Sequence, residues 1–147
     1  MVQADVKIEL IRKLLDSGQP VSFRFAGTSM SPLISEGDGV LVEPVEIDGA
    51  RPGEVLAYEY EGRLVAHVLH FSLKLGRQSW LFFKGISNSW GDRPVQGDKV
   101  VGKVTHVQIN DALQPLALMN INPSSILAWR RFLSPGRWLR AAKGALT

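Results

Sequence analysis

The feature that most constrains the fold of this chain is a succession of short β-rich segments separated by turn residues. Stretches rich in Gly, Pro, Asn and Asp lie between them, where they favour turns. Many short strands broken by turns are typical of a mainly β domain and not of alternating β and α units. The expected strands are Val21–Phe25, Val40–Val42, Val55–Tyr60, Arg63–His70, Ser79–Lys84 and Lys99–Ile109.

Two further patterns complete the expected architecture. Apolar residues recur at three- and four-residue spacing in residues 4–17, which predicts an amphipathic helix that ends near Gly18. Glu61-Gly62 lies between two β-rich runs and predicts a hairpin. The chain of 147 residues fits one domain with a real core. Because it has no cysteine, disulfides, a cysteine nucleophile and thiolate metal sites are excluded.

The positive charge of the chain is concentrated at its C-terminal end. The net charge is +3, from 17 Lys and Arg against 14 Asp and Glu. Residues 112–147 contain no acidic residue, and their basic residues are Arg130, Arg131, Arg137, Arg140 and Lys143. We therefore divide the chain into a slightly acidic domain, residues 1–111, and a basic amphipathic tail, residues 112–147. Since the basic charge belongs to one segment, we expect no nucleic-acid partner.

The residue pattern of the tail predicts its secondary structure. Residues 123–147 read as two short helices broken at Ser134-Pro135-Gly136, with tryptophan, phenylalanine and leucine among the cations. Such a segment either packs on the domain with its arginines in water or lies on anionic lipid as a peripheral contact. The sequence predicts no membrane-spanning helix and no signal peptide, because its long uncharged stretch contains prolines and asparagines and its start is acidic. We therefore expect a cytoplasmic protein that contacts membranes at most peripherally.

Five short motifs occur in a fixed order over about residues 21–107. The motifs are Ser29-Met30-Ser31-Pro32, Gly37-Asp38, Gly53-Glu54-Val55, Lys84-Gly85-Ile86-Ser87-Asn88 and Gly102-Lys103-Val104. Any one of them alone is a weak signal, but together and in this order they resemble the signal peptidase I family and its LexA-like, self-cleaving relatives. The resemblance implies a compact fold of coiled β-sheets with a serine-peptidase site, preceded here by the helix and followed by the tail.

The resemblance also implies the catalytic residues. Ser29 matches the family's nucleophile, which needs a base to take its proton. His67 stands where bacterial members have a lysine, as in the archaeal and endoplasmic-reticulum branch, and histidine suits a general base because it ordinarily titrates near pH 6.5. Asp92, followed by Arg93, matches the aspartate that orients the histidine in that branch.

Other residues near the serine complete the implied site. Thr28, Met30 and Pro32 flank Ser29 and are expected to contribute to the oxyanion or substrate site, together with backbone N–H groups. The three histidines lack a close carboxylate cluster, so no metal or other cofactor is expected. Lys84 and His70 are rival bases. Lys84 belongs to the motif expected to have a scaffold role, and alternation on a strand places His70 on the face opposite His67.

Each candidate residue also has an ordinary structural interpretation. Ser29 could cap a turn, His67 could be a half-buried strand histidine, and Asp92 could form a loop hydrogen bond. Three positions depart from the family's pattern: Gly27 lacks the hydroxyl of many relatives, Val68 replaces an arginine, and Ile86 replaces an aspartate.

Three functions follow from these observations. The first is a serine endopeptidase that cleaves a precursor peptide or protein by a Ser–His–Asp mechanism, without the membrane anchor usual in the family. The second is a catalytically inactive relative that binds peptides or a partner, as the three departures suggest. The third is a self-cleaving regulator, which is disfavoured because the residues before Ser29 leave no room for a helix-turn-helix domain.

Overall fold

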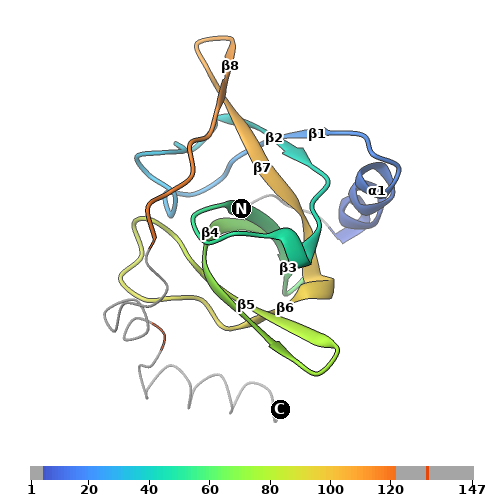
Figure 1. The fold of residues 1–147 in the computed structure, drawn as a ribbon. Coiled ribbons are helices and arrows are strands. Elements are labelled where there is room, and N and C mark those ends of the chain that lie inside the picture. Colours follow the sequence, from blue (N-terminus) through green and yellow to red (C-terminus); the bar gives the residue numbers. More distant parts are fainter. Residues whose placement is uncertain (1–4, 122–131, 133–147) are drawn as a thin grey trace.

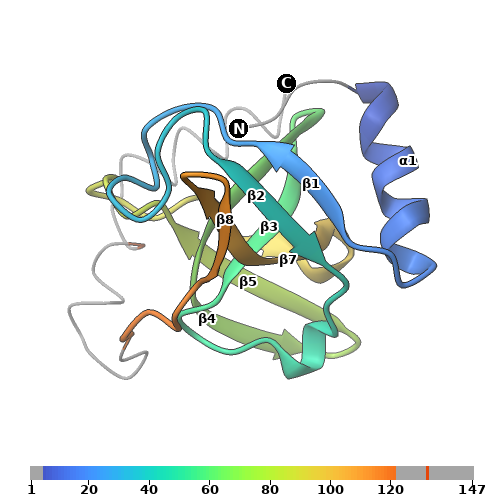
Figure 2. The same cartoon turned by 90° about the horizontal axis from the view of Figure 1, so that it is seen from above.

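The protein, described here from a computed structural model, is mainly β over residues 5–121 and Phe132, which are the residues that the structure describes. Eight strands form one antiparallel sheet with the order β1-β2-β7-β3-β4-β5-β6, and β8 pairs with the outer part of β7 (Figures 1 and 2). The elements are α1 (Asp5–Asp16), β1 (Val21–Arg24), β2 (Gly39–Glu43), the 3-10 turn η1 (Ile47–Gly49), β3 (Val55–Tyr60), β4 (Arg63–Leu75), β5 (Gln78–Lys84), β6 (Val95–Gln96), the 3-10 turn η2 (Gly97–Lys99), β7 (Val100–Ile109) and β8 (Ala112–Pro115). The mainly β prediction is confirmed.

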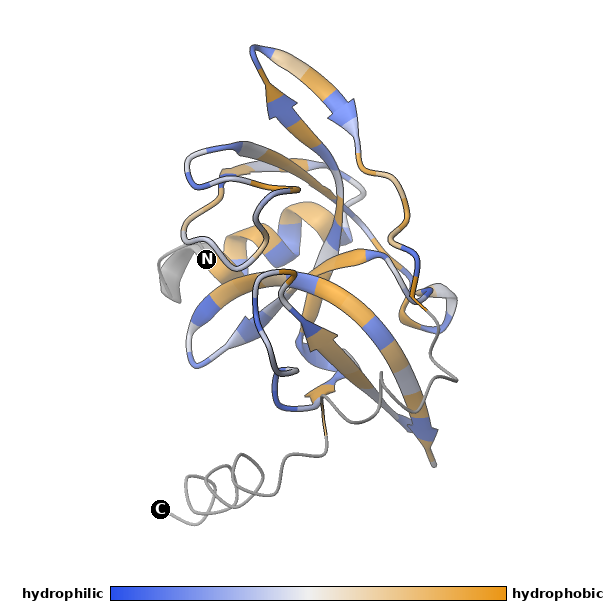
Figure 3. Cartoon of the chain, turned by 90° about the vertical axis from the view of Figure 1, so that its left-hand side faces the viewer, coloured by the Kyte–Doolittle hydropathy of each residue, from blue (hydrophilic) through white to orange (hydrophobic). Residues whose placement is uncertain are grey.

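The observed elements differ from the sequence expectations mainly at their ends. β4 continues beyond His70 to Leu75, and β6 is a short strand within a segment expected to be irregular. Residues 112–115, which the charge pattern assigned to the tail, instead form β8, and the β7–β8 hairpin projects from the sheet (Figure 1). Hydrophobic and hydrophilic positions alternate along this hairpin (Figure 3). The sheet therefore extends past residue 111. The two helices predicted within residues 123–147 lie outside the described residues, apart from Phe132.

Irregular strand pairing bends the sheet around the site. The register of β7 shifts against β2 between Leu41 and Val42, and against β3 between Ala57 and Tyr58. A third shift lies on β4, between Leu69 and Phe71. An extra residue on one strand increases the local right-handed twist and bends that strand. These shifts explain why burial along β7 does not follow the strict alternation that its sequence predicts.

Strand β3 separates two parts of the core because its side chains alternate between its faces. Val55 and Ala57 join a large cluster that includes Ile11 and Leu15 of α1. Leu56 and Tyr58 join a second cluster on the opposite face. Since His67 pairs with Leu56 in the β3–β4 ladder, its side chain is placed on the side of Leu56 and Tyr58. No helix among the described residues is long and apolar enough to cross a membrane.

Candidate active site

Ser29 lies in a tight turn that follows β1. Gly27 opens this turn with a φ of 89°, a left-handed conformation that favours glycine over a residue with a side-chain hydroxyl. The Ser31 N–H donates to the Thr28 carbonyl at 3.1 Å, and the Ile34 N–H donates to the Met30 carbonyl at 3.0 Å. Met30 is fully buried in the core. The turn is thus anchored by Met30 and presents the half-buried Ser29 side chain at the surface.

His67 lies on β4 and reaches the serine. Its Nε2 is 3.0 Å from Ser29 Oγ, which is hydrogen-bonding distance. The imidazole is largely buried, with 10% of its side chain exposed. β4 is paired on both sides, with β3 and β5, so His67 is held by one of the internal strands of the sheet.

Asp92 comes from the loop between β5 and β6, residues 85–94, and is placed by its own backbone. Its N–H donates to the Phe83 carbonyl at 2.7 Å. Its Oδ2 accepts a short hydrogen bond from Nδ1 of His67. Because a carboxylate only accepts, this pairing assigns the imidazole proton to Nδ1 and leaves the Nε2 lone pair facing Ser29. Serine, histidine and aspartate therefore stand in the order that general-base activation of a serine requires.

The β5–β6 loop also holds the Ser29 turn. The Ser87 N–H donates to the Ser29 carbonyl at 2.9 Å, and the Ser87 hydroxyl donates to the Ser31 carbonyl at 2.9 Å. Gly85 is needed for this approach, since a Cβ at position 85 would lie 2.8 Å from the Ser29 carbonyl oxygen. One loop thus holds the Ser29 turn and also carries Asp92, so it links the two ends of the Ser29–His67–Asp92 arrangement.

Tyr58 is a site residue that the sequence interpretation missed. Its hydroxyl donates to Asp92 Oδ2 at 2.5 Å and lies 3.3 Å from His67 Nδ1. Its ring stacks on Phe83 at a centroid distance of 4.4 Å. Burial, and then the neighbouring Asp92 charge, raises the pKa of Tyr58 far above its ordinary value, so the hydroxyl remains a donor at any physiological pH.

The residues that flank Ser29 divide into exposed and buried positions. Thr28 and Pro32 are exposed beside the serine, and a cis peptide bond precedes Pro32. The Met30 side chain is wholly enclosed in the core, so only its backbone is available to an oxyanion or substrate site. The assignment of Thr28, Met30 and Pro32 to that site stays a prediction. The alternation along Ser29-Met30 sends one side chain outward and the next inward.

Lys84, the rival base, and two positions that depart from the family's pattern, Val68 and Ile86, have contacts that indicate structural roles. Lys84 is buried, and its Nζ donates to the Gly85 carbonyl at 2.9 Å, within the loop that holds the site. Val68 is buried in the large core cluster, and the half-buried Ile86 packs against the same cluster. Both departures thus contribute apolar contacts where the resembled family has charged side chains.

The other two histidines do not join the constellation. His70 is buried, and its ring meets Phe132 edge-on at a centroid distance of 5.6 Å. Nδ1 of the half-buried His106 lies 2.9 Å from the hydroxyl of Thr105. Within residues 5–121 and Phe132, no group of three or more His, Asp or Glu side chains is arranged to hold a metal ion.

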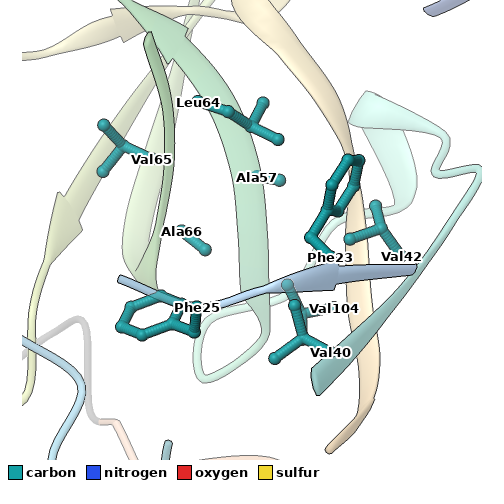
Figure 4. A pocket seen from close by; sticks show the side chains of 9 residues that line it. All are labelled: Phe23, Phe25, Val40, Val42, Ala57, Leu64, Val65, Ala66 and Val104. Carbon is teal, nitrogen blue, oxygen red and sulfur yellow. The ribbon is translucent and has the colours of Figure 1, made fainter. Parts of the chain in front are cut away.

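A small apolar hollow lies between β1 and the β3–β4 hairpin (Figure 4). Ala57 and Ala66 line it on the side of the hairpin, above β1 in the view of Figure 4. Ala66 precedes His67 in the chain, and Phe25 lies on the segment that leads from β1 to Ser29. The residues that line the hollow are Phe23, Phe25, Val40, Val42, Ala57, Leu64, Val65, Ala66 and Val104. The lining is wholly apolar, and most of these residues belong to the buried core.

Comparison with known proteins assigns the chain to no family. No family model matches it, and no curated protein sequence is significantly similar to it. The functional interpretation therefore depends on the geometry of the site and on the resemblance carried by the five sequence motifs.

Proposed function

We propose that this protein is a serine endopeptidase with a fold like that of the signal peptidase and LexA-like families, in which Ser29, His67 and Asp92 form the catalytic triad. One observation carries the proposal: the three side chains come from three separate parts of the chain and meet in the order serine, histidine, carboxylate. A chance meeting of unrelated surface groups would not reproduce this order.

The geometry supports a two-step acyl transfer. His67 Nε2 takes the Ser29 proton as Oγ attacks the scissile carbonyl carbon, and Asp92 stabilises the resulting imidazolium. His67 then gives that proton to the leaving amine, and an acyl-enzyme on Ser29 remains. A water molecule, deprotonated by the same nitrogen, attacks the ester and releases the carboxylic acid product.

The backbone N–H of Ser29 is the candidate oxyanion donor. In the part of the chain that the structure describes, no hydrogen bond engages this N–H group. Gly27 supplies no hydroxyl, so the neighbouring exposed Thr28 is the available side-chain donor. Charge that develops on the substrate oxygen would be stabilised by such fixed donors.

The substrate of the proposed reaction is an extended peptide. β1 pairs only with β2 among the described strands, so an extended peptide can be proposed to pair with its other edge, near the turn that carries Ser29. Ala66, which lines the apolar hollow, precedes His67 in the chain, so we expect small or apolar substrate side chains near the scissile bond. A dedicated precursor peptide or protein fits these requirements.

The basic tail gives the proposed location. Residues 123–147 would bring a cytoplasmic enzyme into peripheral contact with anionic membranes. We expect the protein to sediment with anionic vesicles at low salt and to be released at high salt. Absence of vesicle binding at low salt would contradict this part of the proposal.

A second function, peptide binding without catalysis, is favoured by one specific observation. Gly27, Val68 and Ile86 replace polar or charged residues of the resembled family, and Val68 is part of the apolar core. An inactive relative would keep the open edge of β1 and the hollow while losing turnover.

The decisive experiment exposes the protein to a proteome-derived peptide library and identifies new termini by mass spectrometry. We expect cleavage by the wild-type protein, none by Ser29→Ala, and retained cleavage by Ser31→Ala, which changes a serine in the same turn. Cleavage by Ser29→Ala at the wild-type rate would refute the assignment of Ser29 as the nucleophile. Peptide binding without any cleavage by the wild-type protein would establish the second function instead.

A further inference from the structure

The Tyr58 hydroxyl belongs to a buried polar network that extends beyond the three residues of the proposed triad. Asp92 Oδ2 accepts from both the Tyr58 hydroxyl and His67 Nδ1. The Tyr58 oxygen is also 3.3 Å from that same nitrogen. Three polar groups thus meet around one imidazole proton, and a second donor restrains rotation of the carboxylate about its side-chain bond.

The position of Tyr58 is set by packing that does not depend on the hydroxyl. The residue is 2% exposed, lies in the second core cluster with Leu56 and Leu69, and stacks on Phe83 with an interplanar angle of 22°. Phe83 also accepts the Asp92 N–H through its carbonyl. The same residue of β5 therefore positions the tyrosine by its ring and the aspartate by its backbone.

We infer that Tyr58 is a positioning residue that holds the Asp92 carboxylate on Nδ1 of His67, so that the histidine keeps its proton on Nδ1 and its lone pair toward Ser29. This inference rests on the proposed serine-peptidase function for its catalytic consequence. The positioning itself is a property of the structure and can be measured whether or not the protein cleaves peptides. A carboxylate that is partly exposed, as Asp92 is at 20% of its side chain, otherwise has water as a competing partner.

The test is Tyr58→Phe, which keeps the stacked ring and removes only the hydroxyl. Tyr60→Phe is the matched control, because it makes the same chemical change on the same strand at a half-buried tyrosine. The first readout is the ring ¹⁵N chemical shifts of His67, which report the nitrogen that carries the proton. We expect the Nδ1–H tautomer in the wild-type protein and in Tyr60→Phe, and a mixture of tautomers in Tyr58→Phe. Wild-type ¹⁵N shifts in Tyr58→Phe would overturn the inference.

The second readout is the rate at which a small fluorophosphonate modifies Ser29. Loss of a hydrogen bond to a charged group predicts a rate about 10- to 100-fold lower in Tyr58→Phe. If Tyr58 acts through Asp92, the same substitution has little effect in an Asp92→Ala background. An equal loss in both backgrounds would show a merely structural role and would overturn the inference. If the wild-type protein fails to react, the proposed function fails, while the tautomer measurement still decides the role of Tyr58.

Discussion

His67 and His70 lie three residues apart on β4 and are both buried, yet their surroundings have opposite chemistry. His67 meets a hydroxyl at Nε2 and a carboxylate at Nδ1. His70 faces the ring of Phe132, which also makes edge-on contacts with Phe71 and Phe82. We call these regions the polar site and the aromatic cluster. Burial alone therefore does not distinguish the two histidines. The hydroxyl and the carboxylate at the ring nitrogens of His67 support its proposed role as a general base.

The two regions are joined by the β5–β6 loop. Asp92 belongs to the polar site, and the preceding Gly91 packs against Phe132 so closely that a Cβ at position 91 would overlap the ring. The loop is thus fixed by hydrogen bonds on one side and by aromatic packing on the other. Substitutions on the two sides should have different effects, on rate for the polar site and on stability for the aromatic cluster.

Replacing His67 and His70 in separate variants should give the largest difference in the rate of Ser29 modification. His67→Ala should lower the Ser29 modification rate by about 10⁴-fold or more, because the nucleophile loses its base. His70→Leu, a substitution that suits the aromatic surroundings, should keep the rate within about threefold and act mainly on the melting temperature. Equal rates for the two variants would contradict the assignment of the base.

Removal of the carboxylate charge gives the next largest effect. Asp92→Asn should lower the rate by about 10³-fold, since an amide can stabilise the wrong tautomer and cannot balance the imidazolium charge. The control is Asp98→Asn, at an exposed aspartate in η2, which should leave the rate unchanged. A wild-type rate in Asp92→Asn would exclude Asp92 from the triad.

The contact between Gly91 and Phe132 is tested by a double-mutant cycle. Phe132→Ala should lower the free energy of unfolding by about 3 kcal/mol, because a buried aromatic ring is removed. Gly91→Ala should destabilise the wild-type protein by about 1–3 kcal/mol through overlap with that ring. In the Phe132→Ala background the overlap is gone, so the effect of Gly91→Ala should largely vanish. Additive losses, measured by denaturant unfolding, would refute the contact.

The buried Glu54 provides a reference outside both regions and the smallest expected effect. Burial raises the pKa of Glu54, but hydrogen bonds and charge from Lys103, together with the Arg51 N–H at 2.5 Å, outweigh burial and lower the pKa below its ordinary value. A lowered folded-state pKa adds stability above the unfolded pKa, and this stability is lost as the pH falls through the folded value.

Glu54→Gln should therefore lower the free energy of unfolding at pH 7 by about 1–3 kcal/mol and flatten its decline below about pH 4.5. The Ser29 modification rate should stay unchanged. Exposed Glu61, in the β3–β4 turn, supplies the control Glu61→Gln, for which we expect the wild-type pH dependence. An unchanged acid limb of the stability curve in Glu54→Gln would contradict the ion pair.

The sequence predicted the strands and the three polar-site residues because each leaves a local signal. Alternating β-rich runs marked the strands, a short motif marked Ser29, and the match to positions of the resembled family indicated His67 and Asp92. The placement of Tyr58 beside His67 could also have been predicted from the sequence. A two-residue turn at Glu61-Gly62 pairs Leu56 with His67, so Tyr58 lies diagonally across from the histidine on the same face.

Other features depend on contacts that no local pattern encodes. β6 has two residues and exists only because Trp80 and Leu81 of β5 pair with it. β8 follows Asp111, the last acidic residue. Because the tail was defined by its charge, these residues were assigned to the tail and not to the sheet. The burial of Phe132 against Gly91 joins segments about 40 residues apart and follows from the tertiary fold alone.

Activation of Ser29 by His67 underlies every proposal made above. The most direct measurement is the intact mass of the protein after reaction with a small fluorophosphonate, followed by mapping of the modified residue. We predict one adduct per chain, on Ser29, formed by the wild-type protein and by His70→Leu but not by His67→Ala. No adduct on the wild-type protein, or equal labelling of wild type and His67→Ala, would contradict the account.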